Sequence, residues 1–180
     1  MQLQSWTRRT FALSAAFLVG LGLVVSVSPE ANARHHRKHA RRQVSTVVTV
    51  ASKDAELKTT VSAIKKAGLV HALSSKGPFT AFLPSDAGWA KLTKENRESL
   101  LNDPKRLAEV LKYHVVKGKY SAADLAERRS LVTLQGESLM LDNKDGTVIV
   151  DGCIVTKGDV KAGNGMIHVI DYVATPERGK

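Results

Sequence analysis

The sequence is poor in cysteine and in aromatic residues. Cys153 is the one cysteine among 180 residues, which excludes an intrachain disulfide. Aromatic residues make up 5% of the chain, so aliphatic side chains must fill most of the core. The hydrophobic content of 43% and the charged content of 24% are ordinary for a globular protein, and the length suggests one domain with tails.

The short motifs of the common enzyme classes are also absent from the sequence. It contains no G-x-S-x-G elbow, no H-E-x-x-H zinc motif and no G-x-x-x-x-G-K phosphate loop. Ser85-Asp86 follows a predicted strand, where a helix cap explains both residues. Cys153 alternates with Val155 in a Val- and Ile-rich segment, which predicts a buried and inert thiol. We therefore expect a protein that is not an enzyme and carries no cofactor.

A long uncharged run is present near the N-terminus. It covers residues 11–27, follows Arg8 and Arg9, and precedes Ala31 and Ala33 at the positions that a signal peptidase reads. Residues 1–33 are therefore predicted to be an export signal, with a periplasmic or secreted mature chain. The twin arginines leave both ordinary secretion and twin-arginine export open. The run also reaches the lower limit for a bilayer span, so an uncleaved membrane anchor is the alternative.

Basic charge is concentrated directly after this segment. Residues 34–42 hold five Lys or Arg and three His, whereas the net charge of the whole chain is +10. Such a run cannot bury apolar surface, so residues 34–43 are predicted to be a disordered basic arm. Its natural partners are an anionic envelope polymer or lipid headgroups. Nucleic acid is not expected, because the chain lacks basic residues interleaved with aromatic ones.

The start of this arm is a candidate metal site. If cleavage follows Ala33, the mature chain begins Arg34-His35-His36. A free amine with histidine at the third position can bind Cu(II) or Ni(II) in a square plane through four nitrogens. This pattern keeps open a second class of function, a periplasmic metal-handling or hydrolytic protein.

The rest of the chain is predicted to be one α+β domain, residues 44–176, followed by a tail, residues 177–180. Helical patterns begin at Asp54, Asp86 and Asp103, and a short apolar strand ends at Pro84. After residue 120 the segments are short, rich in Val and Ile and separated by glycine turns. This change predicts an antiparallel meander of strands.

Two histidines fall on apolar faces of these predicted elements. His114 continues the apolar stripe of the helix that begins at Asp103, and His168 shares a strand face with Met166 and Ile170. Both are predicted to be buried and structural. A neutral imidazole in a core must find hydrogen-bond partners for both ring nitrogens.

Three segments give the chain a family resemblance. They are GPFTAFLPSDAGWAKL at 77–92, LKYHVVKGKY at 111–120 and NGMIHVIDYVATP at 164–176. In this order they resemble the signature segments of the fasciclin domain family. The resemblance implies a wedge of two small β-sheets packed with several short helices, in which Pro84, Asp86 and Gly165 are structural. It also implies a monomeric adhesion or interaction module that binds a protein or glycan at a cell surface.

The same resemblance implies two partner-binding sites. In animal fasciclin proteins the tyrosine-histidine segment is linked to cell attachment, and it matches Tyr113 and His114 here. We expect the Tyr113 ring to be partly exposed, since it flanks the stripe. An Asp-Ile pair that binds integrins in some animal members matches Asp159 and Val160, in an expected glycine-hinged loop. A core histidine and a solvated aspartate are the structural alternatives for these sites.

Overall fold

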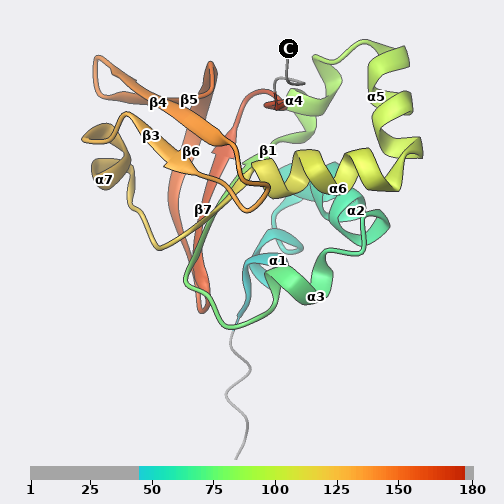
Figure 1. The fold of residues 1–180 in the computed structure, drawn as a ribbon, viewed down its shortest axis with the longest axis horizontal. Helices are drawn as coiled ribbons and strands as arrows, with labels where there is room; N and C mark the ends of the chain where they lie inside the picture. The colour runs from blue at the N-terminus through green and yellow to red at the C-terminus, as the bar shows by residue number, and fades with distance from the viewer. Residues whose placement is uncertain (1–44, 177–180) are drawn as a thin grey trace, which may run out of the picture. The chain divides into compact units, whose positions relative to one another are not determined.

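A computed structural model describes residues 45–176. The predicted export signal, the basic arm and the tail lie outside this range. The helices in the described part are α1 (Val47–Ala51), the 3-10 helix η1 (Ala55–Leu57), α2 (Lys58–Lys66), α3 (Val70–Leu73), α4 (Asp86–Ala90), α5 (Lys94–Asn102), α6 (Pro104–Tyr113) and α7 (Ala122–Ala126) (Figure 1). The strands are β1 (Phe79–Pro84), β2 (Val115–Lys117), β3 (Ser130–Val132), β4 (Ser138–Lys144), β5 (Thr147–Val150), β6 (Cys153–Ala162) and β7 (Gly165–Ile170).

The predicted helices begin at residues whose side chains cap the helix N-terminus. Asp103 accepts hydrogen bonds from the backbone N–H groups of Lys105 and Arg106 at 3.1 Å, and Pro104 occupies the first turn of α6. Asp54 caps η1, which leads into α2, so the single helix expected from Asp54 is a 3-10 turn followed by an α-helix. Each cap satisfies backbone donors that have no partner inside the helix, and this fixes where the helix starts.

The strands form one mixed sheet in the order β2-β1-β7-β6-β5-β4-β3. Strands β3 to β7 pair antiparallel in chain order, which confirms the predicted meander, whereas β1 pairs with β7 in parallel. The two separate sheets that the family resemblance implied are not confirmed, because hydrogen-bonded pairs connect all seven strands. The sheet also curls: Leu134 N–H donates to the Val115 carbonyl at 2.7 Å, which joins the end of β3 to β2 at the opposite edge.

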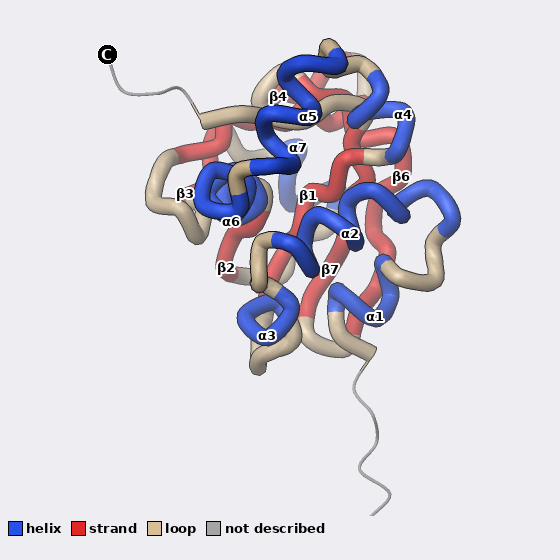
Figure 2. Tube along the Cα trace, turned by 90° about the vertical axis from the view of Figure 1, so that its right-hand side faces the viewer, coloured by secondary structure: helices blue, strands red, loops and turns tan. Residues whose placement is uncertain are grey.

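The core consists of two clusters of buried side chains that share the central strands. Ala81 and Leu83 of β1 pack with the helical cluster, while Phe82 between them packs with the cluster inside the curled strands. Strand β7 alternates in the same way. Both strands are therefore buried on both faces, which explains why they are almost continuously apolar. Figure 2 shows α1, α2 and α3 gathered beside β1 and β7.

Hydrogen bonds from α2 hold the turn between β1 and α4. The Thr60 hydroxyl donates to the Pro84 carbonyl at 2.6 Å and accepts from the Trp89 indole at 2.7 Å. Asp86 accepts from the Thr59 backbone N–H at 2.8 Å, while Ser85 caps α4. Pro84 and Asp86 thus lie where the sheet meets the helical cluster, and their contacts are internal to the fold.

Candidate functional site

His114 lies at the end of α6 with 1% of its surface exposed. Its Nδ1–H donates to the Val110 carbonyl at 2.7 Å, and its Nε2 accepts from the Ala174 backbone N–H at 3.1 Å. The ring therefore connects α6 to the segment that follows β7. Burial lowers the pKa of His114 from 6.5 to about 4, against a smaller raising effect of the Val110 hydrogen bond. A neutral imidazole in one tautomer satisfies both contacts.

Tyr113 is also buried, with 4% of its surface exposed, so the expectation that its ring is partly exposed is wrong. The helix ends at this residue, and the ring packs into the cluster inside the curled strands while His114 lies edge-on beside it. Its hydroxyl donates to the Asp151 carboxylate at 3.1 Å, at the turn between β5 and β6. The adjacent tyrosine and histidine thus anchor α6 to different parts of the fold.

His168 on β7 is fully buried and stacks on Phe82, with 5.7 Å between the ring centroids. Its Nε2–H donates to the Tyr120 carbonyl at 2.9 Å, and its Nδ1 accepts from the Asp159 backbone N–H at 3.4 Å. Burial lowers the pKa of His168, while the Tyr120 bond and the Asp159 charge oppose the shift. This histidine holds the neutral tautomer opposite to that of His114.

Asp159 and Val160 lie inside β6 rather than in the loop that was expected between strands. The register of β6 against β7 shifts between Lys157 and Val160, so a bulge takes up the extra residues and the strand continues. Asp159 has a φ of 57° and is exposed. Its carboxylate accepts from the Ala122 backbone N–H at 2.9 Å, and Val160 is half-buried against the helical cluster.

The thiol of Cys153 lies buried at the start of β6. Burial, followed by the charges of Asp171 and Asp151, raises the pKa of Cys153 to about 11. The thiolate is the nucleophilic form of cysteine, and the raised pKa keeps this side chain protonated near neutral pH. Cys153 is therefore poorly suited to covalent chemistry.

Arg34, His35 and His36, the proposed metal ligands, lie outside the described residues. Between residues 45 and 176, no three His, Cys, Asp or Glu side chains gather closely enough to hold a metal ion. In the same range no helix is long and apolar enough to cross a membrane.

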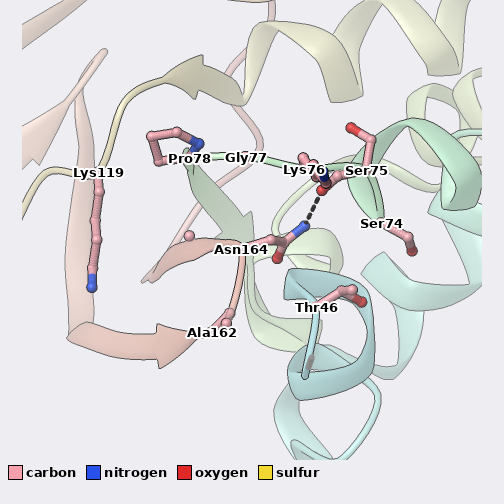
Figure 3. A pocket seen from close by; sticks show the side chains of 11 residues that line it. Thr46, Ser74, Ser75, Lys76, Gly77, Pro78, Lys119, Ala162 and Asn164 are labelled. Atoms are coloured by element: carbon pink, nitrogen blue, oxygen red, sulfur yellow. Dashed lines mark hydrogen bonds between the residues drawn. The ribbon is translucent and has the colours of Figure 1, made fainter. Parts of the chain in front are cut away.

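A groove with a volume of about 510 Å³ opens where four segments distant in sequence meet (Figure 3). Its lining consists of Thr46, Ser74, Ser75, Lys76, Gly77, Pro78, Lys119, Ala162, Gly163, Asn164 and Gly165. None of these lining residues is acidic, and Lys76 and Lys119 lie on opposite sides of Pro78 in Figure 3. The volume is within the range of small-molecule sites in proteins.

The side chain of Asn164 holds together the segments that line this groove. Its side chain is buried and donates to the carbonyls of Leu73 at 2.8 Å and Ser75 at 2.9 Å. Its Oδ1 accepts from the Val47 backbone N–H at 2.8 Å. One amide thereby fixes three segments that line or border the groove. In the sequence, Asn164-Gly165 resembles an ordinary turn, so the residue gives no local sign of this role.

Glycines permit the close backbone approaches beneath the groove. A Cβ atom on Gly77 would collide with the Asn164 carbonyl, and one on Gly165 would collide with the Phe79 carbonyl. Phe79 N–H donates to the Asn164 carbonyl at 3.1 Å across the same approach. Gly165 is thus needed for close packing between the start of β7 and β1.

A family model described as Fasciclin domain matches residues 55–176. The chain belongs to the fasciclin domain family. Protein sll1483 of Synechocystis sp. is 38% identical over 170 residues, which cover 92% of this chain and 94% of that protein. Immunogenic protein MPB70 of Mycobacterium bovis is 32% identical over 135 residues, 72% of this chain and 68% of that protein.

The fold agrees with a solved member of the family. A FAS1 domain pair from the insect cell adhesion molecule Fasciclin I matches with a TM-score of 0.62 at 25% identity, over 74% of this chain and 52% of that chain. This match and the family model confirm the predicted resemblance. Fasciclin domains are adhesion and interaction modules, and the present chain shares their fold.

Proposed function

We propose that the protein is an exported, non-enzymatic adhesion or interaction module that binds a partner in the cell envelope, the matrix or a host surface. In this proposal residues 1–33 are the export signal, residues 34–43 a basic arm and residues 44–176 the binding domain. The partner is a protein or a glycan, and the domain acts as a monomer. Membership of the fasciclin domain family supports the proposal, as does the likeness to a pair of domains from a cell adhesion molecule.

This proposal rests on one observation: the histidine and cysteine side chains that could do chemistry make their contacts inside the fold. All four ring nitrogens of His114 and His168 bond to backbone groups, and each ring contacts at least one segment distant in sequence. The Cys153 thiol is buried with a raised pKa. These groups hold elements together, so recognition by exposed residues is the function that the domain supports best.

Within this proposal Asp159 and Val160 form the contact that the family resemblance suggests. Asp159 is exposed, and its hydrogen bond from Ala122 orients the carboxylate at a fixed place on the bulge. Val160 contributes packing beneath it. Tyr113 and His114 act indirectly, because both are buried and position α6. The basic arm adds an attraction to anionic polymers or lipid headgroups that weakens with salt.

The test compares Asp159→Asn with Asp142→Asn, a matched change at an exposed aspartate on β4. Purified mature protein is immobilised and exposed to solubilised envelope and matrix fractions, and saturable binding is quantified. We expect Asp159→Asn to weaken binding, since it removes the charge but keeps an acceptor for Ala122, while Asp142→Asn binds like the parent. Equal binding by both variants would place the contact elsewhere on the domain.

A further inference from the structure

The groove around Asn164 offers hydrogen-bond donors that the protein itself does not use. Within residues 45–176, the backbone N–H groups of Lys76 and Gly77 donate to no protein acceptor. Both residues line the groove, and Gly77 is half-buried. An unsatisfied donor in a partly buried place costs free energy unless a ligand or water accepts from it. These two N–H groups are available to an oxygen acceptor of a ligand.

The charge around the groove has one sign. Lys76 and Lys119 line it, and Lys117 and Lys161 are exposed on the adjoining parts of β2 and β6. The lining contains no carboxylate to neutralise these ammonium groups. The lining also includes Thr46, which follows in the sequence shortly after residues 34–42 with their five Lys or Arg. The occupant that complements this surface carries negative charge.

The remaining lining consists of small residues and hydroxyls. Ser74, Ser75 and Thr46 supply the hydroxyls, and Pro78 and Ala162 supply apolar surface. The groove therefore lacks a deep apolar pocket for a large peptide side chain, which is how a peptide usually anchors. Sugar rings that carry hydroxyl and carboxylate groups match a groove that mixes donors with modest apolar surface.

We propose that this groove binds a carboxylate-bearing polysaccharide, with a sugar acid carboxylate held between Lys76, Lys119 and the free backbone donors. The inference rests on the proposed binding function and assigns it a ligand class and a second site, distant in sequence from Asp159. Because Asn164 already holds the segments of the groove together in the free protein, binding costs little conformational entropy. The arm raises the local concentration of the same polyanion through long-range attraction.

The experiment measures binding of an oligogalacturonate to the full mature chain by calorimetry at physiological salt, where attraction over long distances is screened. One variant, Lys76→Gln with Lys119→Gln, removes two charges from the groove. A second, Ser74→Trp, fills the groove and keeps its charge. The control, Lys105→Gln with Lys112→Gln, removes two exposed charges from α6, outside the groove. Thermal melting of each variant checks that the fold is retained.

We expect the groove variants to weaken binding about tenfold each, because charged contacts and space are lost, while the control binds like the parent. Equal weakening by the two double-lysine variants, with no effect of Ser74→Trp, would overturn the proposal and assign the attraction to net charge. If a poly-glutamate peptide binds in the groove with equal or higher affinity, the proposal is overturned and the ligand is an acidic peptide rather than a polysaccharide. Absence of oligogalacturonate binding by the parent protein, alongside intact Asp159-dependent capture, would refute this inference and leave the proposed function standing.

Discussion

His114 offers a direct test of how the tyrosine-histidine segment works. Replacing it by alanine leaves the buried Ala174 N–H without an acceptor, which costs about 1–3 kcal/mol. The vacated space in the core adds a further cost, so we expect a loss of about 2–4 kcal/mol in the free energy of unfolding. His114→Gln is the matched variant, because glutamine can offer an acceptor from a similar position but does not titrate.

The same site predicts a pH dependence with a definite sign. The folded state holds the pKa of His114 at about 4, below its ordinary value of 6.5. As the pH falls below 6.5 the unfolded chain takes up the proton first, so stability decreases until the folded pKa is reached. The full effect of this group is about 3 kcal/mol between pH 7 and pH 4. His168 and several carboxylates also titrate, so the comparison with His114→Gln isolates this contribution.

Urea unfolding followed by tryptophan fluorescence measures both effects, since Trp89 is buried in the helical cluster. The stability advantage of the parent over His114→Gln should shrink by about 3 kcal/mol from pH 7 to pH 4. Parallel pH profiles for the two proteins would refute the reasoning. A His114→Ala variant that melts like the parent but no longer binds a partner would show that the histidine contacts the partner directly.

Three further predictions follow from individual contacts and segments. Asn164→Ala should lower the free energy of unfolding by about 2–4 kcal/mol in the same urea assay, because it removes three side-chain hydrogen bonds, two of them buried; stability equal to the parent would contradict the organising role. Cys153 should react slowly with iodoacetamide at pH 8 in folded protein and quickly in urea, since burial raises its pKa to about 11; equal rates would contradict an inert thiol. Intact-mass measurement of exported protein should give Arg34 as the first residue, whereas a mass that retains residues 1–33 would indicate a membrane anchor.

The elements that local signals specify were predictable from the sequence. Asp103 and Pro104 mark the start of α6 through capping chemistry, and His114 follows on its buried apolar stripe as the spacing predicts. Asp151-Gly152 forms the tight turn between β5 and β6, with both residues at positive φ. These features depend on neighbours within a few residues, which a sequence pattern records.

Features that depend on distant contacts were not predictable in this way. The parallel pairing of β1 with β7 joins residues more than eighty positions apart, and nothing in either strand specifies its partner. Tyr113 is buried because the curled strands fold over it, although its position beside the stripe suggested partial exposure. The groove depends on Asn164 bringing together segments near Val47, Ser75 and Gly163, and its sequence resembles a simple turn.

The central claim is that the folded domain recognises a partner and that the arm contributes only electrostatic attraction. The most direct measurement is saturable binding to envelope and matrix fractions by mature protein with and without residues 34–42, at physiological and at high salt. The account predicts that the deletion removes most of the salt-sensitive binding, leaves the melting temperature unchanged and preserves a saturable component. Loss of all saturable binding on deletion, or stoichiometric copper or hydrolytic turnover in the intact protein, would contradict it.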